Sequence, residues 1–198
     1  WLPCDAMKPL AAKGKMAALI DSYETGTQDW TADFPAEFKR RRGYDMMPFM
    51  AVMAEGRVVG SLEESDRFLW YVRKTKAELM DENYYGHFTE LCHAHGMKAY
   101  TEPYDNGNFD EMIAGAYADM PMGEFWQDQT NQRSIKLVAS VMHMNGQGIM
   151  GAESFTSQSR WTEYPYGLKS LGDFMWTQGL NRFVFHRFAM QPNATAVP

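Results

Sequence analysis

The chain alternates between short apolar runs and longer amphipathic segments. Four of the short runs end at a glutamate, at residues 17–24, 97–102, 120–124 and 148–153. A fifth run, residues 182–187, ends at His186 and Arg187. None of the five runs carries a polar face, which is typical of strands that are covered on both sides, as in a parallel sheet.

Segments with the three-to-four-residue apolar spacing of helices separate these runs. Asp33 and Gly43 delimit a first helix, and a second helical stretch ends by Gly56. Ser61 and Glu64 form a capping box that begins the longest helix, which we expect to run to about residue 95. Shorter helices are predicted at residues 110–118, 133–143 and 165–179.

The longest predicted helix carries one apolar stripe. We expect the stripe to pack inward and Lys76, which interrupts it, to extend its amine to solvent. The remaining members of the stripe are Leu69, Val72, Leu79, Met80, Tyr84, Phe88 and Leu91. On the later helices, Ile135, Val138 and Met142 are predicted to share one buried face, as are Leu168, Leu171 and Met175.

Strands that alternate with helices through short connections predict an α/β fold with a parallel sheet. The 198 residues are fewer than the roughly 250 of a complete eight-stranded α/β barrel. We therefore predict a partial (β/α)8 TIM-type barrel, with about five parallel strands, as a single domain over residues 1–198. The chain begins with Trp1 rather than Met, and we expect the rest of the barrel to lie in a longer protein.

Charge and composition narrow the range of partners. The formal net charge of −6 argues against nucleic acid, which requires a basic surface. The basic run 39–42 falls in the last turn of a predicted helix, where it complements the helix dipole. No apolar run approaches the roughly 20 residues of a membrane span. Cys4 and Cys92 cannot form a disulfide framework or a thiolate zinc site, and we interpret Cys92 as a small core residue.

The candidate chemistry lies at the ends of the predicted strands. In a parallel α/β barrel the C-terminal strand ends converge on one face, so we expect Glu24, Glu102, Glu124 and Glu153 to surround one pocket together with Asp21. Crowded carboxylates suit glycoside hydrolysis, because like charges raise one pKa and so supply an acid at neutral pH. They also suit a hard cation such as calcium or magnesium. The chain contains no dinucleotide, P-loop or HExxH motif.

Seven ordered motifs extend over nearly the whole chain. They are residues 21–24 (DSYE), 41–45 (RRGYD), 83–86 (NYYG), 99–104 (AYTEPY), 121–126 (PMGEFW), 151–156 (GAESFT) and 181–187 (NRFVFHR). In these motifs the chain resembles the catalytic barrel of glycoside hydrolase family 106, the α-L-rhamnosidases. The resemblance implies the later part of a barrel in a large enzyme, with the five strands as its fourth to eighth.

The resemblance also implies an activity. The family releases terminal α-L-rhamnose with inversion, using two glutamates and a calcium ion, and it suggests export from a bacterium. Carried onto this chain, the general acid is Glu24 and the general base Glu153, with Glu102 and Glu124 as calcium ligands. The implied substrate-binding residues are Asp21, Tyr23, Glu102, Tyr104, Trp126, His186 and Arg187.

Two other hypotheses fit the same residues. A metal-dependent lyase or aldolase barrel would use the carboxylates as ligands, although no Schiff-base lysine or histidine base stands out. Alternatively, the chain is an inactive sugar-binding fragment, because a five-stranded arc leaves an open edge on each side. For His186, a packing role is as consistent with the sequence as contact with substrate.

Overall fold

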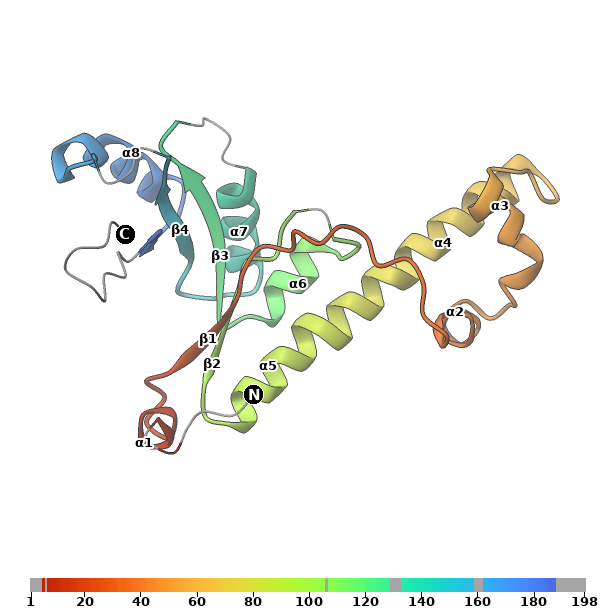
Figure 1. Cartoon of the computed structure of the whole chain (residues 1–198), viewed down its shortest axis with the longest axis horizontal. Coiled ribbons are helices and arrows are strands. Elements are labelled where there is room, and N and C mark those ends of the chain that lie inside the picture. The colour runs from red at the N-terminus through yellow and green to blue at the C-terminus, as the bar shows by residue number, and fades with distance from the viewer. Residues whose placement is uncertain (1–4, 6, 106, 129–132, 159–161, 188–198) are drawn as a thin grey trace, which may run out of the picture.

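The chain folds around one parallel sheet in a computed structural model that describes residues 5, 7–105, 107–128, 133–158 and 162–187 (Figure 1). The sheet order is β1-β2-β3-β4-β5, and every neighbouring pair is parallel. The strands are β1 (Ala17–Ile20), β2 (Lys98–Thr101), β3 (Met120–Trp126), β4 (Gly151–Thr156) and β5 (Arg182–Phe185). They form a curled half-barrel that alternates with helices, which confirms the predicted partial α/β barrel.

The helices follow the predicted order. They are α1 (Lys8–Ala11), α2 (Phe34–Arg42), the 3-10 helix η1 (Met47–Phe49), α3 (Met50–Glu55), α4 (Leu62–Met80), the π-helix η2 (Asp81–Gly86), α5 (His87–Ala94), α6 (Glu111–Tyr117), α7 (Arg133–Met144) and α8 (Pro165–Thr177). In the described part of the chain, no helix has both the length and the apolar character needed to cross a membrane. Cys4 lies outside the described residues.

Two predicted strand boundaries are wrong. The first strand was expected to reach Glu24 but ends at Ile20, and the fourth was expected over 148–153 but spans Gly151–Thr156. The polar residues after Glu153 favoured a loop. In the structure Ser154 is fully buried and its hydroxyl donates to the carbonyl of Ala152, so a polar residue continues the strand.

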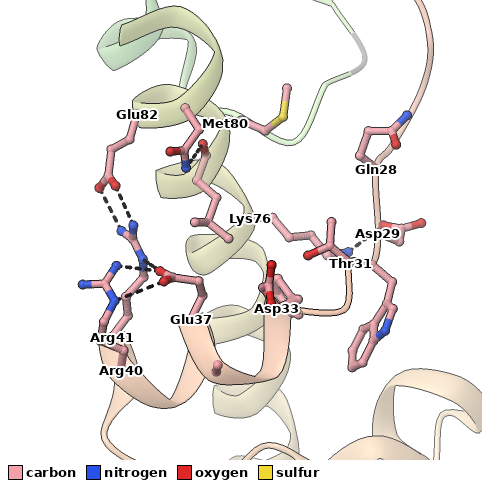
Figure 2. Close-up of a pocket in the computed structure, with 15 residues that line it drawn as sticks. Gln28, Asp29, Thr31, Asp33, Glu37, Arg40, Arg41, Lys76, Met80 and Glu82 are labelled. Carbon is pink, nitrogen blue, oxygen red and sulfur yellow. Dashed lines mark hydrogen bonds and ion pairs between the residues drawn. The ribbon is translucent and has the colours of Figure 1, made fainter. Parts of the chain in front are cut away.

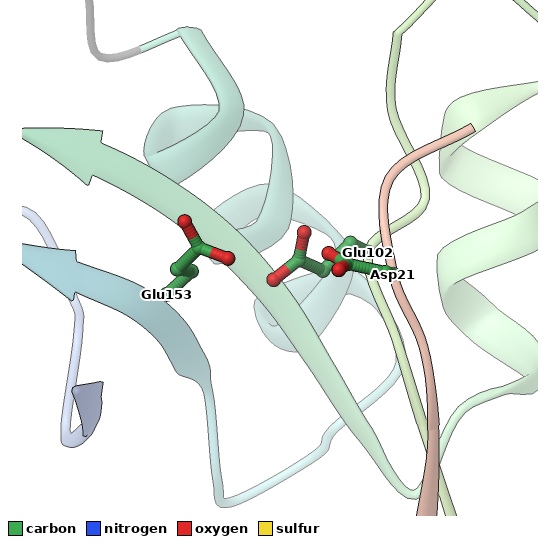
Figure 3. A group of neighbouring side chains, drawn as sticks. All are labelled: Asp21, Glu102 and Glu153. Carbon is green, nitrogen blue, oxygen red and sulfur yellow. The ribbon is translucent and has the colours of Figure 1, made fainter. Parts of the chain in front are cut away.

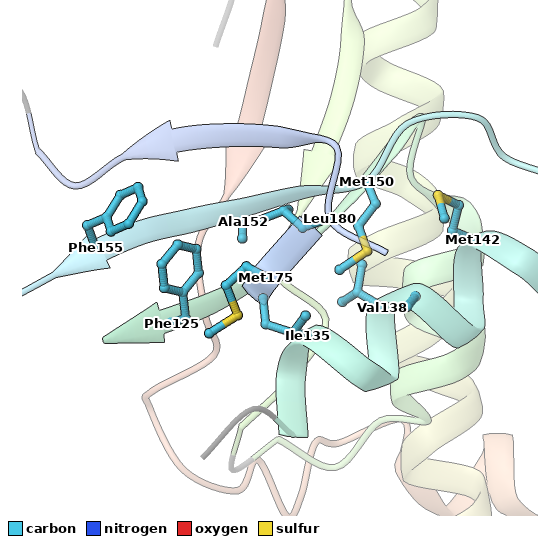
Figure 4. Packing of buried hydrophobic residues seen from close by; sticks show 10 residues of the cluster. Phe125, Ile135, Val138, Met142, Met150, Ala152, Phe155, Met175 and Leu180 are labelled. Atoms are coloured by element: carbon cyan, nitrogen blue, oxygen red, sulfur yellow. The ribbon is translucent and has the colours of Figure 1, made fainter. Parts of the chain in front are cut away.

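The barrel core lies between the second half of the sheet and helices α7 and α8 (Figure 4). Ile135, Val138 and Met142 are all buried there, which confirms the predicted face of α7. Met175 is buried in the same cluster, with Leu168 and Leu171 of α8 packed against it. The cluster also contains Phe125, Ala139, Met150, Ala152, Phe155 and Leu180.

The long helical segment between β1 and β2 begins at the predicted capping box. The Ser61 hydroxyl accepts from the Glu64 amide, and the Glu64 carboxylate accepts from the Ser61 amide. The predicted stripe is only partly buried, because Leu91 is 48% exposed while Phe68, which the stripe omitted, is 1% exposed. The buried face turns toward α2 and α3, and a second core forms there around Phe38, Phe68 and Val72.

Ion pairs join helices α2 and α4 across this second core (Figure 2). The Arg41 guanidinium lies 2.5 Å from a carboxylate oxygen of Glu82 and 3.2 Å from one of Glu78. Arg42 donates to the Thr75 hydroxyl and also pairs with Glu78. The basic run therefore does more than complement the dipole of α2, because it ties that helix to α4.

The sequence predicted that the Lys76 amine would extend to solvent, but in the structure it forms an ion pair. Its amine lies 2.6 Å from a carboxylate oxygen of Asp29, and its side chain is 13% exposed. It therefore forms an ion pair with the segment that leaves β1 (Figure 2).

Candidate active site

Carboxylates from four neighbouring strands gather at one end of the sheet. Asp21 and Glu102 directly follow β1 and β2, while Glu124 and Glu153 lie within β3 and β4 as register partners. Single carboxylate oxygens of Asp21, Glu102 and Glu153 all lie within 4.8 Å of one another (Figure 3). We call Asp21, Glu102, Glu124 and Glu153 the strand-tip carboxylates.

Glu24 does not join them in the structure. It lies four residues beyond the end of β1, where its side chain is exposed and accepts a hydrogen bond from the Ser22 hydroxyl at 3.1 Å. Three of the four predicted glutamates are therefore brought together. Asp21, which was predicted to contact substrate, takes the fourth position.

Glu102 is the most deeply buried member, with 1% of its surface exposed. The Tyr104 hydroxyl donates to its Oε2 at 2.7 Å, whereas its Oε1 has no hydrogen-bond partner among the described residues. Burial raises the pKa of Glu102 to about 9, and the nearby charges of Asp21 and Glu153 add to this effect. Tyr104 opposes the shift because it donates to the carboxylate.

Glu124 is held at both its side chain and its backbone. The Trp126 indole donates to its carboxylate. Its amide donates to the Ser134 hydroxyl, which in turn donates to the Glu124 carbonyl at 2.9 Å. Burial raises the pKa of Glu124 to about 7, and the charge of Glu153 contributes.

The hydrogen bonds between Ser134 and the Glu124 backbone are possible because α7 packs closely on β3. A methyl group on Gly123 would lie 3.1 Å from the Ile135 backbone nitrogen, so a larger residue would push the helix away. The short distance brings Ser134, in the first turn of α7, up to the Glu124 backbone. Sequence reasoning missed Ser134, because nothing in the pattern marks a hydroxyl ten residues away as a partner.

Glu153 receives its hydrogen bond through an irregularity in β4. Phe155 has a φ of +62°, and the pairing with β3 shifts register beside it, so that Trp126 pairs with Thr156. A bulge of this kind re-aims the following side chain. The Thr156 hydroxyl then donates to Glu153 Oε1 at 2.6 Å. Thr156 was also missed, although a hydroxyl three residues after a carboxylate is a usable signal.

The other predicted site residues lie around this cluster. Tyr104 is buried behind Glu102, and Trp126 is bonded to Glu124. His186 lies with its Nδ1 3.8 Å from Glu153 Oε1, and Arg187 is exposed beyond the end of β5. The ring of Tyr23 packs against aromatic side chains rather than among the carboxylates.

No lysine or arginine among the described residues forms an ion pair with the strand-tip carboxylates. A separate hollow of about 630 Å³ lies between the segment 28–41 and helix α4, and none of the predicted site residues lines it (Figure 2). Four acidic groups thus share one end of the sheet, and His186 lies close to one of them, Glu153. Such an arrangement can bind a hard cation or share protons.

Known proteins match this chain over almost its whole length. A family model described as alpha-L-rhamnosidase matches residues 4–198. A solved structure, a rhamnosidase from Novosphingobium sp. PP1Y, superposes with a TM-score of 0.78 at 34% identity over 87% of this chain. A protein of Formosa agariphila named "Putative beta-glucuronidase" is 49% identical over 175 residues, or 88% of this chain. The matches span 17% of the Novosphingobium chain and 15% of the Formosa protein.

Proposed function

The chain belongs to the α-L-rhamnosidases of glycoside hydrolase family 106, and we propose that it forms the part of such an enzyme that cleaves terminal α-L-rhamnose from glycans or glycosides. The observation that carries the proposal is the gathering of four carboxylates at the C-terminal side of one parallel sheet. Barrel enzymes place their reacting groups there.

We assign the general base to Glu153 and the general acid to Glu24. Glu153 has a fixed orientation, because Thr156 donates to one of its oxygens and the other can accept a proton from water. Glu24 is exposed on the loop that follows β1, three residues after Asp21, and a general acid must be accessible to the leaving group of a bound substrate. Inversion predicts a separation of roughly 6.5–9.5 Å between the two carboxyl groups, against about 5–5.5 Å for retention.

A calcium ion fits the donor set of this site. Oε1 of Glu102 is buried and has no hydrogen-bond partner among the described residues, and one carboxylate oxygen of Glu102 lies within 4.8 Å of single oxygens of Asp21 and Glu153. Calcium prefers carboxylate oxygens. Glu102 and Glu124, with Asp21 beside them, would hold the ion, which leaves the second oxygen of Glu153 free to act as the base. A bound calcium ion supplies charge neutralisation and a docking point for the cis-2,3-diol of rhamnose.

The name of the Formosa relative raises a glucuronide as an alternative substrate. A uronate carries its own carboxylate and would meet the strand-tip carboxylates as a like charge. Rhamnose is neutral and avoids this repulsion. The geometry therefore favours the rhamnoside, and assaying an aryl β-glucuronide beside an aryl α-L-rhamnoside compares the two directly.

Variants of the full-length protein test the two catalytic assignments. Glu153→Gln should lower kcat on every aryl rhamnoside by about 100- to 10,000-fold, because it removes the base. Glu24→Gln should have the same effect with a poor leaving group. With a dinitrophenyl leaving group, which needs no protonation, Glu24→Gln should retain most of its activity.

Glu63→Gln is a matched control, because Glu63 is an exposed glutamate on α4 that pairs with Arg67 on the same helix. Its kcat should equal that of the wild type. Proton NMR of the first turnover should show β-L-rhamnose as the initial product. Release of the α-anomer, or full activity in Glu153→Gln, would refute the inverting assignment.

A further inference from the structure

Aromatic side chains from two other segments enclose the loop that follows β1. We propose that Tyr84 and Phe109 are positioning residues that fix, through the ring of Tyr23, the segment that carries Asp21 and Glu24. The kinetic part of this inference rests on the proposed function, since it assumes that these two acids take part in hydrolysis. The structural part does not.

The segment has little backbone support of its own. Beyond Ile20 it leaves the regular ladder and keeps an isolated parallel bridge between Tyr23 and Asp105, in which the Tyr23 amide reaches the Tyr104 carbonyl at 3.5 Å, the outer limit of a hydrogen bond. Ser22 bonds to Asp21 and Glu24 within the same loop. Its position therefore depends on what its side chains contact.

Tyr23 makes those contacts on two sides. Its ring lies edge-on to Tyr84, with centroids 6.0 Å apart, and edge-on to Phe109 at 5.9 Å. Tyr85, which is fully buried, lies 5.0 Å from each of these two rings. Edge-to-face contacts of this kind have a preferred geometry, so they orient the Tyr23 ring as well as bury it.

The π-helix η2 supplies one side of this enclosure. A π-turn contains one more residue than an α-turn, so neighbouring residues can turn to different surroundings. Here Tyr85 points into the interior while Tyr84 faces Tyr23. A methyl group on Gly86 would lie 3.1 Å from the Tyr117 ring of α6, so close packing holds η2 in place.

The β2–α6 loop supplies the other side. A methyl group on Gly107 would lie 1.9 Å from the Phe109 ring and 3.0 Å from Cδ1 of Tyr23. The glycine therefore leaves the space in which the two rings meet. Gly107→Ala must displace Phe109, and with it the support of Tyr23.

Hydrogen exchange of the full-length protein tests the structural part of the proposal. In Tyr84→Ala the amides of residues 21–25 should exchange about tenfold faster or more, whereas Tyr84→Phe should match the wild type because it keeps the ring. Gly107→Ala should accelerate the same amides. Trp70→Ala is the control, since Trp70 is an exposed aromatic residue of α4 that contacts Tyr71 and Lys74.

Kinetics of the same variants test the catalytic consequence. Tyr84→Ala should lower kcat on an aryl rhamnoside by about 10- to 100-fold with a smaller change in KM, because small misplacement of catalytic groups is costly. Tyr84→Phe should restore kcat. If Tyr84→Ala fails to fold, Tyr84→Leu preserves apolar bulk without the aromatic edge and should show the same loss.

The outcomes separate this proposal from the proposed function. The positioning role would be overturned, whatever the activity, if the amides of residues 21–25 exchanged in Tyr84→Ala at the wild-type rate. It would also be overturned if Tyr84→Phe accelerated their exchange as much as Tyr84→Ala does. A wild-type protein that does not hydrolyse rhamnosides would overturn the function while the exchange result still decides the positioning. Faster exchange with unchanged kcat would overturn the catalytic consequence.

Discussion

Two groups of acidic side chains in this molecule have opposite surroundings. Within the described part of the chain, no lysine or arginine forms an ion pair with the strand-tip carboxylates, and the pKa values of Glu102 and Glu124 are raised to about 9 and about 7. The glutamates between α2 and α4 each face an arginine. Hydrogen bonds from Arg40 and Arg41 lower the pKa values of Glu37 and Glu82, respectively.

The difference is the one expected if the first group serves the proposed function and the second group stabilises the fold. A carboxylate beside an arginine gains from ionisation, and it joins two helices. A buried carboxylate beside other carboxylates costs free energy, and such a cost persists where a function requires it. Substitutions in the two groups should therefore shift stability in opposite directions.

Glu102→Gln should give the largest effect on activity. Loss of this buried oxygen donor should reduce rhamnoside hydrolysis by about 100-fold or more, in line with changes at metal sites. At pH 7 in the presence of EDTA the variant should unfold at a higher temperature than the wild type, because folding of the wild type requires Glu102 to take up a proton and Gln does not. Calorimetric melting and the kcat of the full-length protein measure both effects, and a lower melting temperature with full activity would contradict the comparison.

Glu78→Gln should act in the opposite direction. It leaves Arg42, whose side chain is 8% exposed, without its carboxylate, and it also removes a partner of Arg41. We expect a loss of about 2–3 kcal/mol in the free energy of unfolding and little change in the affinity for calcium. Denaturant titration checks the first point, and an unchanged midpoint would show that the network does not stabilise the helices.

Asp81 combines features of both groups. It belongs to the helical segment but is 2% exposed, with an unpartnered Oδ1 among the described residues. Burial raises its pKa from 3.8 to about 7. The native state therefore binds this proton more tightly than the unfolded state, so its contribution to stability is largest below pH 4 and falls as the pH rises to about 7.

Asp81→Asn should remove that pH dependence. The variant should be more stable than the wild type by about 3–4 kcal/mol at pH 8 and nearly equal to it at pH 4. Free energies of unfolding at pH 4, 6 and 8 give the comparison. An equal difference at all three values would show that Asp81 does not titrate in this range.

Glu63→Ala should have the smallest effect. Glu63 pairs with Arg67 on the surface of α4, and the two side chains are 81% and 54% exposed. We expect a change of about 0.5 kcal/mol or less in the free energy of unfolding. If Glu63→Ala lowered the free energy of unfolding as much as Glu78→Gln, burial would not explain why some ion pairs stabilise the fold more than others.

The sequence alone predicts the order of elements well, because apolar runs and caps are local signals. The capping box of α4 and the buried face of α7 are both confirmed. Contacts between distant segments are not encoded locally, so the pairing of Arg41 with Glu82 and the bulge at Phe155 were missed. The sequence predicted Asp21 and four glutamates around one pocket, because the C-terminal ends of parallel strands converge. The structure gathers Asp21, Glu102, Glu124 and Glu153, whereas Glu24 lies outside the cluster.

Calorimetric titration of calcium into the full-length protein tests the role of the strand-tip carboxylates most directly. We predict that the wild type and Glu78→Gln bind calcium equally well, and that Glu102→Gln binds it at least about tenfold more weakly. The absence of binding to the wild type, or equal binding by Glu102→Gln, would contradict the assignment of these carboxylates to a cation and sugar site.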